Sequence, residues 1–316
     1  MLKLEGVSKV YKVGTFGGRE LQAVCNVRFD VQDKEVVSLI GESGSGKSTI
    51  GKMILRLTAA SAGKITFNGK DISTLQGTAL KEYYRCVQGV FQDPFSSYNP
   101  IFKADRVFKM IRDAYFPEVS AEEWSAKLNS CLEATGLNPE HVLNKYPHQL
   151  SGGQLQRFLI ARALLLDIEF LVADEIISML DASTRIDVLN LLAELKSRGL
   201  SILFITHDLS LAHYISERAV ILYRGCMVEM GETDKIFNNP LHPYTQMLIA
   251  SVPTLDKRWD DKKGIAIEKK AGQPTPTRGC VYMERCPQAK AGCGSDRPAL
   301  VEIESGHYVA CINYGS

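Results

Sequence analysis

The residues best suited to chemistry in this 316-residue chain form the stretch GESGSGKST, residues 41–49. Its glycines let backbone N–H groups turn inward, and a helix beginning near Lys47 adds its positive end. In such a loop the lysine bridges the terminal phosphates of a nucleotide and Ser48 ligates Mg²⁺. The apolar run EVVSLI just before it favours this interpretation over a glycine-rich turn without a ligand. The expected nucleotide-binding residues are Gly41, Ser43, Gly44, Ser45, Gly46, Lys47, Ser48 and Thr49.

A second apolar run ends in two carboxylates, in the stretch FLVADE at residues 170–175. Asp174 and Glu175 would lie at the C-terminal end of a core strand, where open α/β sheets place their ligands. Asp174 can hold Mg²⁺ through water, while Glu175 polarises the attacking water as a general base. An acidic turn is the simpler alternative, and the phosphate loop in the same chain disfavours it.

Two polar side chains follow other apolar runs. His207 ends the strand pattern FITHD, from which it can reach the γ-phosphate, although a single histidine is often structural. Gln92 follows the run in VFQDP, at the start of a helical insert. We expect both to belong to the nucleotide site, with Gln92 also near the Mg²⁺. Taken alone, Gln92 would be an ordinary turn residue.

A second glycine-rich loop, LSGGQ, lies about a hundred residues after the first and precedes the helical pattern LQRFLIARALLL. Ser151, Gly152, Gly153 and Gln154 would therefore stand at a helix N-terminus, which is another anion site. One nucleotide in one monomer does not need two such sites. We expect the second loop to close over the nucleotide of a partner chain, so that two chains enclose two nucleotides at their interface.

The elements that position these residues are of several kinds. Alternating patterns predict antiparallel strands in the first seventy residues, and apolar runs that alternate with helical patterns predict a parallel sheet covered by helices. Residues 92–150 form a predicted helical insert that lacks strand runs between 104 and 148. From residue 254 the composition is that of a linker. The predicted domains are 1–253 and a cysteine-rich extension within 254–316.

Composition limits the classes of function. Lys plus Arg is 37 against 36 acidic residues, so no overall charge recruits nucleic acid or an anionic membrane. Without a signal peptide or an uninterrupted apolar segment, we expect a soluble, cytoplasmic protein. An ATP-driven switch acting on nucleic acid remains an alternative, but long coiled-coil insertions and a basic stripe are missing. A scaffold with an inactive nucleotide site is disfavoured by Glu175 and His207.

The ordered motifs resemble those of ABC-type ATPases over about residues 2–253. The resemblance implies a P-loop NTPase fold with a RecA-like parallel-sheet core, an antiparallel β-subdomain, an α-helical subdomain insert and a small cysteine-rich extension. It also implies that Tyr11 stacks on adenine, although a tyrosine packed in the β-subdomain is the alternative. Asp181, in SMLD at 178–181, is similar to the aspartate whose loop passes between the two sites of the dimer.

A closer resemblance is to the ATPase subunits of dipeptide and oligopeptide ABC importers, in particular their F-like members. It rests on the three stretches GESGSGKST, DPFSSYNP (93–100) and NPLHPYTQMLIASVP (239–253), and on four cysteines near the C-terminus. The implied partners are a second related ATPase subunit in a heterodimer, two membrane permease subunits and an external substrate-binding protein, with no nucleic acid. The implied location is the cytoplasmic face of the membrane, and the implied cargo is peptide, with oligosaccharide or nickel as alternatives.

The sequence departs from this family at several positions. Ile176 and Ile177 stand where Pro-Thr usually follows the catalytic glutamate, and Met179 replaces a usual alanine. Both carboxylates remain, so we expect hydrolysis, with its rate open. Lys34 replaces a common glycine, which we expect to be a turn variation only.

The four cysteines near the C-terminus are separated by five, six and seventeen residues. Four thiolates suit tetrahedral zinc or an iron-sulfur cluster, and the spacing is not the paired one of zinc ribbons. Resemblance to the importer ATPases implies a 4Fe-4S cluster with a structural role, and zinc or plain thiols remain open. His307 is expected beside the ligands or at the surface. The implied cluster ligands are Cys280, Cys286, Cys293 and Cys311.

Overall fold

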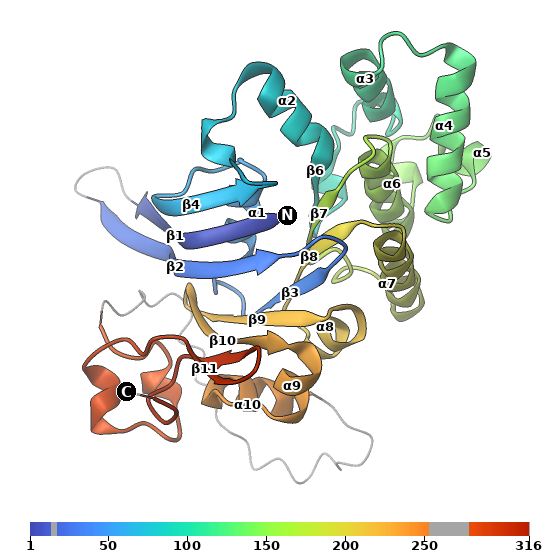
Figure 1. The fold of residues 1–316 in the computed structure, drawn as a ribbon. Coiled ribbons are helices and arrows are strands. Elements are labelled where there is room, and N and C mark those ends of the chain that lie inside the picture. The colour runs from blue at the N-terminus through green and yellow to red at the C-terminus, as the bar shows by residue number, and fades with distance from the viewer. Residues whose placement is uncertain (14–17, 253–277, 316) are drawn as a thin grey trace. The chain divides into compact units, whose positions relative to one another are not determined.

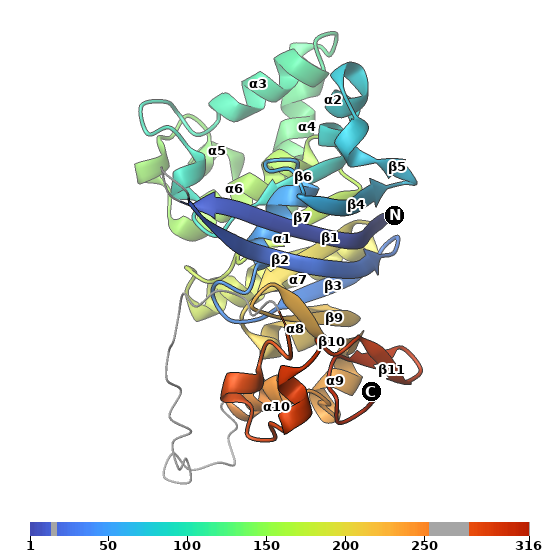
Figure 2. The same ribbon diagram turned by 90° about the vertical axis from the view of Figure 1, so that its left-hand side faces the viewer.

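The computed structural model describes residues 1–13, 18–252 and 278–315, which divide into two compact units. The first unit comprises residues 1–31, 36–73 and 205–316, and the second comprises residues 32–35 and 74–204. Figures 1 and 2 draw their elements from two directions. Most of the predicted linker, from residue 254 to 277, lies outside the described residues.

The first unit contains a four-stranded antiparallel sheet in the order β2-β1-β4-β5. Leu2 of β1 pairs with Val31 on one side and with Phe67 on the other. Along β1 the buried Leu2 and Leu4 alternate with the exposed Lys3 and Glu5, so one face of the sheet is apolar. This confirms the predicted antiparallel strands. The strands are β1 (Leu2–Val13), β2 (Arg19–Val31), β4 (Ala62–Phe67) and β5 (Lys70–Asp71).

A second, mixed sheet crosses the first unit in the order β11-β12-β10-β9-β3. Ile40 pairs with Ile221 in parallel, as the sequence predicts. Beyond β9 the sheet continues with strands that were not predicted from the sequence, and these are antiparallel, because a two-residue turn at Arg224 and Gly225, both with positive φ, reverses the chain. The elements are β3 (Val36–Ile40), α1 (Lys47–Ile54), α8 (Leu209–Ile215), β9 (Arg218–Tyr223), β10 (Cys226–Glu232), α9 (Thr233–Asn238), α10 (Pro243–Ala250), β11 (Val301–Glu304) and β12 (His307–Val309).

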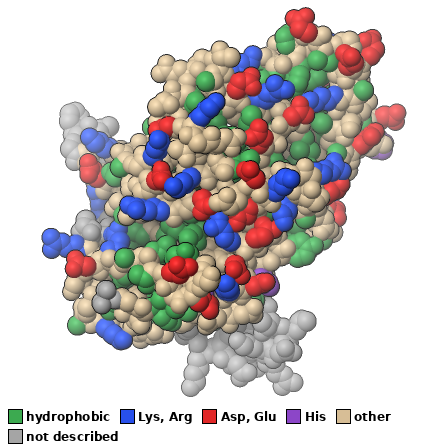
Figure 3. All heavy atoms as spheres, in the orientation of Figure 1, with side chains coloured by type: hydrophobic (Ala, Val, Ile, Leu, Met, Phe, Trp, Pro, Cys, Tyr) green, Lys and Arg blue, Asp and Glu red, His purple; other side chains and the backbone are tan. Residues whose placement is uncertain are grey.

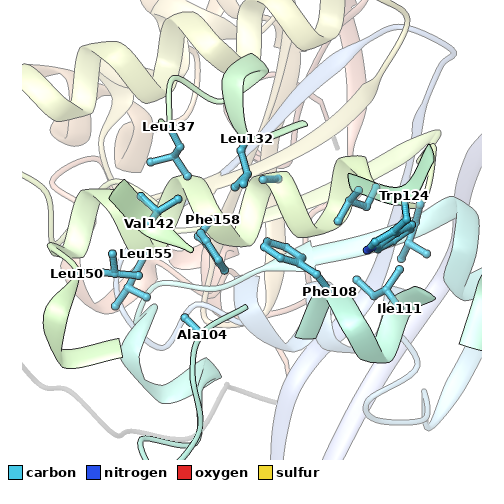
Figure 4. Close-up of a cluster of buried hydrophobic side chains, with 13 residues drawn as sticks. Ala104, Phe108, Ile111, Trp124, Leu132, Leu137, Val142, Leu150, Leu155 and Phe158 are labelled. Carbon is cyan, nitrogen blue, oxygen red and sulfur yellow. The ribbon is translucent and has the colours of Figure 1, made fainter. Parts of the chain in front are cut away.

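The second unit combines parallel strands with helices. Val90 pairs with Ala173 in parallel, and β8 (Ser201–Thr206) continues from this unit into the first. As predicted, the region of the insert is helical, and its core gathers around Phe108, Trp124 and Phe158 (Figure 4). The other elements are α2 (Gly77–Cys86), β6 (Val87–Val90), α3 (Arg106–Tyr115), α4 (Ala121–Ala134), α5 (Pro139–Val142), α6 (Gly152–Leu164), β7 (Phe170–Asp174) and α7 (Ala182–Ser197).

The backbone conformation of Lys34 shows why glycine would suit this turn. Its φ is +60°, a left-handed conformation that glycine adopts without strain. The turn is held because the Lys34 N–H donates to Ser201 Oγ at 2.8 Å. The structure therefore gives a local reason for regarding this substitution as a turn variation.

The surface carries charges of both signs close together. On the face shown in Figure 3, basic and acidic side chains are interspersed. Ion pairs among the described residues include Lys3 with Glu5 at 2.6 Å and Lys127 with Asp167 at 2.8 Å. Within residues 1–13, 18–252 and 278–315, no helix combines the length and apolar character that crossing a bilayer requires.

Candidate nucleotide site

The phosphate loop joins β3 to α1 in the first unit, as the sequence predicts. Gly46 is the N-cap residue of α1 with φ +98°, and a Cβ there would lie 2.4 Å from the carbonyl oxygen of Ala23. A Cβ on Gly41 would lie 2.2 Å from the carbonyl oxygen of Leu222. Only glycine fits at these positions, so the backbone is free to curve around a ligand.

Lys47 occupies the centre of this loop. Its side chain is buried, and its ammonium donates to the carbonyl oxygens of Gly41 at 2.7 Å and Glu42 at 3.1 Å. Ser45 is also buried, whereas Ser43 and Ser48 are exposed. The loop therefore holds a positive charge beside the first turn of a helix, the arrangement that phosphate oxygens require.

Glu42 is the residue of this loop that sequence reasoning missed. Its N–H donates to the hydroxyl of Tyr244 at 2.9 Å, and its carboxylate accepts from Arg285 at 2.9 and 3.1 Å. Arg285 also donates to the hydroxyl of Tyr223, and the Glu42 hydrogen bonds raise the pKa of its guanidinium. Side chains from α10 and from the C-terminal extension thus brace the phosphate loop. The only sequence signal was the family-like stretch that contains Tyr244.

Two other predicted residues lie in the first unit. Tyr11 is half-buried on β1 and pairs with Leu21 of β2, and Lys9 Nζ lies 4.9 Å from the centre of its ring. His207 is exposed directly after β8, where Asp208 caps the next helix, α8. Both side chains are accessible to a ligand.

In the second unit, the acidic pair ends β7 as predicted. Asp174 is buried, and Glu175 is half-exposed with φ +50°, a strained conformation for a residue with a side chain. Ile176 and Ile177 are buried, so these departures from the family pattern add to the core behind the acids. Met179 is exposed.

Gln92 follows β6, and Asp174 is the last residue of the neighbouring strand β7. Val90 of β6 pairs with Ala173 of β7 in parallel, so the two polar residues stand at the same edge of the sheet. Gln92 is exposed two residues after β6. This edge presents an amide and a carboxylate, both of which are oxygen ligands suited to Mg²⁺.

The second glycine loop forms the N-terminus of α6, as predicted. Ser151 is exposed and accepts from the N–H of Gln154 at 3.2 Å, while Gln154 Oε1 accepts from the N–H of Ser151 at 2.9 Å. This reciprocal pair is a capping box. A Cβ on Gly153 would lie 2.7 Å from Cγ2 of Thr184, so α6 and α7 approach closely at this point.

Asp181 lies at the same point, as the N-cap residue of α7. Its carboxylate accepts from Ser183 Oγ at 2.6 Å and from the N–H and hydroxyl of Thr184 at 3.0 and 2.8 Å. These hydrogen bonds hold its pKa well below the usual range for aspartate. Thr184 therefore contacts both Asp181 and Gly153, which links the two loops within one unit.

The four tail cysteines belong to the first unit and carry free thiols. The N–H of Cys280 donates to the carbonyl oxygen of Cys293 at 2.7 Å. Burial, with a contribution from Cys293, Cys311 and Cys286, raises the pKa of the Cys280 thiol. In the described part of the chain, no three His, Cys, Asp or Glu side chains are arranged to hold a metal ion.

His307 is not a surface residue. It is fully buried, and its Nε2 lies 2.7 Å from a carboxylate oxygen of Glu229. Glu229 also accepts from the N–H groups of Leu241 and His242 at 2.9 and 2.8 Å. The expectation of a surface position is therefore wrong, because β12 pairs with β10 and turns His307 inward.

The phosphate loop lies between a buried strand and a helix, and the same chain has an acidic strand end and a second glycine loop. These features define a P-loop nucleotide-binding protein. Two family models match: "ABC transporter" over residues 24–178, and "Oligopeptide/dipeptide transporter, C-terminal region" over residues 228–293.

Curated relatives match almost the whole chain. A putative oligopeptide transport ATP-binding protein of Bacillus subtilis is 40% identical, with 94% of this chain and 91% of the relative covered. The oligopeptide transport ATP-binding protein OppF of Salmonella typhimurium is 37% identical, with 93% and 88% covered. The dimeric ATP-binding cassette MJ0796 bound to ADP and Pi superposes with a TM-score of 0.66 at 31% identity, over 74% of this chain and 99% of that one. The chain belongs to the ABC transporter family, among the ATP-binding proteins of oligopeptide and peptide transporters.

Proposed function

We propose that this ATPase powers the import of peptides through a membrane permease. One observation supports this cargo above the others: the region that matches the oligopeptide/dipeptide transporter model contains Tyr244 and Arg285, the two side chains that brace the phosphate loop. The part of the chain typical of peptide transporters is thus built into the nucleotide site. The names of the relatives, peptide and oligopeptide transport ATP-binding proteins, agree with the same cargo.

In the proposed reaction, the phosphate loop and Lys47 bind the phosphates, and Tyr11 stacks on adenine. Ser48, Asp174 and Gln92 would hold Mg²⁺, which neutralises phosphate charge when bound. The fit rests on two observations: Ser48 is exposed in the first unit, and Gln92 and Asp174 stand at one sheet edge in the second.

Glu175 acts as the general base on the attacking water in this proposal, and His207 contacts the γ-phosphate. Glu175 has a left-handed backbone and is half-exposed, whereas the residues on either side, Asp174 and Ile176, are buried. Holding a charged base in a strained conformation at a strand end is typical of functional residues.

The second loop acts in trans. Ser151 is exposed, and the N-terminus of α6 offers backbone donors and a positive dipole end to the nucleotide of a second, related ATPase subunit. Asp181 contacts the same partner subunit in this proposal, because Thr184 joins it to Gly153 of the second loop. Two permease subunits and an external substrate-binding protein complete the assembly, which places this chain at the cytoplasmic face of the membrane.

The tail cysteines would hold a structural 4Fe-4S cluster. All four thiols are free and lie in one unit, so they supply the ligand type that such a cluster takes, although in the described residues they are not arranged around a metal position. Visible absorbance and iron content of anaerobically purified protein test this proposal. Colourless protein with one zinc per chain would replace the cluster by zinc, and protein without metal would leave plain thiols.

Peptide uptake tests the whole proposal. A strain that lacks the gene should lose growth on a peptide as sole amino-acid source, and the intact gene should restore it. Glu175→Gln should preserve ATP binding and abolish both turnover and growth. Normal peptide uptake with loss of oligosaccharide or nickel uptake would contradict the peptide assignment, and unchanged hydrolysis by Glu175→Gln would contradict the base.

A further inference from the structure

A pair of cysteines lies against the phosphate loop, outside the nucleotide site described above. The N–H of Cys25 on β2 donates to the carbonyl oxygen of Gly225 at 2.8 Å, and the N–H of Gly225 donates to the carbonyl oxygen of Ser45 at 3.0 Å. A Cβ on Gly46 would lie 3.5 Å from Cα of Gly225. The backbone that carries Cys25 and the adjacent Cys226 is therefore in direct contact with the loop.

The two thiols share a polar environment. The thiol of Cys226, which is 4% exposed, donates to the carbonyl oxygen of Arg224 at 3.8 Å, and its side chain lies within hydrogen-bonding reach of Cys25. A guanidinium nitrogen of Arg297, from the C-terminal extension, donates to the sulfur of Cys25. Cys25 itself is half-buried. The guanidinium donor at its sulfur stabilises the thiolate form.

The other scattered cysteines lack this environment. The neighbouring Cys226 thiol and the Arg297 guanidinium lower the pKa of the Cys25 thiol to about 6, despite its partial burial. Burial raises the pKa of Cys86 to about 11 and also raises that of Cys131. Because the thiolate is the nucleophile, Cys25 is the reactive one of the three at neutral pH.

We propose that Cys25 is a site of reversible thiol–disulfide exchange, with Cys226 as its resolving thiol and a low-molecular-weight disulfide as oxidant. The Cys25 thiolate attacks one sulfur of the oxidant RS–SR, whose S–S bond breaks to release RS⁻ and leave Cys25–S–S–R. The released RS⁻ takes the proton of Cys226, and the Cys226 thiolate then attacks the Cys25 sulfur. A second RS⁻ leaves, so two electrons pass to the oxidant and a Cys25–Cys226 disulfide forms.

The disulfide would act on nucleotide binding through the backbone. It ties β2 to the first residue of β10, and Gly225 between them holds Ser45 of the phosphate loop. In the disulfide the Cys25 sulfur carries no negative charge, so the hydrogen bond from Arg297 of the C-terminal extension to this sulfur should weaken. We expect the oxidised protein to bind ATP about fivefold more weakly, the lower end of typical coupling between sites.

Glutathione disulfide tests the site in the full-length protein. Peptide mass mapping should find the Cys25–Cys226 disulfide, reversed by dithiothreitol, and Cys226→Ser should stop at a glutathione adduct on Cys25. Cys131→Ser is the control and should still form the disulfide. Absence of both the disulfide and the adduct at Cys25 would overturn the proposal.

Two further measurements need no change at the cysteines. In the reduced wild-type protein, iodoacetamide should label Cys25 at least about tenfold faster than Cys131 at pH 7, as expected for a thiol whose pKa lies below that of its neighbours. Arg297→Gln should slow this labelling. Equal labelling rates for Cys25 and Cys131 would overturn the proposal that Cys25 is the reactive thiol. Unchanged ATP affinity of the fully oxidised protein would overturn the proposed effect of the disulfide on the phosphate loop.

Discussion

The two glycine loops are held in opposite ways. The phosphate loop has a buried lysine at its centre and is braced by Tyr244 and Arg285, which are distant in sequence. In the second loop Ser151 is exposed, and the capping bonds reach only three residues along the chain. The first loop is held by side chains that are distant in sequence, whereas the cap of the second is local, with Thr184 packed against Gly153. Changes at the first should therefore weaken nucleotide binding by the isolated chain, and changes at the second should affect only the assembled transporter.

The largest effect is expected for Lys47→Ala. It removes the cation and two charge-assisted hydrogen bonds from the loop, and we expect ATP affinity to fall about 100-fold or more. Isothermal titration of the isolated chain measures this. Lys52→Ala, on the exposed side of the same helix, is the control and should bind normally. Equal affinities for the two variants would show that Lys47 does not reach the nucleotide.

A smaller effect is expected for Ser151→Ala. Loss of a serine cap costs about 1 kcal/mol of helix stability. Ser120 caps α4 with the same capping box, so Ser120→Ala is a matched control for that cost. Only Ser151→Ala should lower ATP turnover of the assembled transporter, by about tenfold, the scale of one lost hydrogen bond to a charged group. Neither variant should change ATP affinity of the isolated chain. Similar turnover losses in both would mean that the cap acts through stability alone.

The same contrast explains what the sequence could predict. The phosphate loop, the acidic strand end and the capped start of α6 were predicted because each is set by neighbouring residues. The Glu42–Arg285 pair was not, because its partners are 243 positions apart and both look like ordinary surface charges. The inward turn of His307 depends on β12 pairing with β10, and nothing in the spacing of the tail cysteines indicates that pairing.

The contact of Arg285, from the C-terminal extension, with Glu42 of the phosphate loop should have a moderate effect on ATP affinity. Arg285→Ala removes the bidentate contact with Glu42, and we expect ATP affinity to fall about fivefold, since the pair is partly exposed. A double-mutant cycle with Glu42→Gln should give a coupling of about 1 kcal/mol. Glu284→Gln is the control, because it breaks the neighbouring ion pair with Arg224 and leaves the loop alone. Additive effects of the two changes would mean that the brace does not support the loop.

The smallest effect concerns how the extension is anchored. Burial disfavours the charged form of His307, but hydrogen bonds with Glu229 and Glu304 outweigh it and raise its pKa. The nearby His242 stays neutral above pH 5, because burial lowers its pKa to about 4. A raised pKa in the folded state means that the stabilisation is fully present below the unfolded pKa of about 6.5 and is lost as pH rises through the folded value. The free energy of unfolding should therefore decrease as pH rises above about 6.5.

Urea titrations across this pH range, compared with His307→Gln, isolate the contribution of the imidazole. Glutamine keeps a hydrogen bond to Glu229 but cannot gain a proton, so its stability should vary less with pH, and the difference between the two proteins should shrink as pH rises. A constant difference would mean that His307 is neutral in the folded protein. In that case the extension would be held by hydrogen bonds alone, and the phosphate loop would keep its brace at every pH at which the chain is folded.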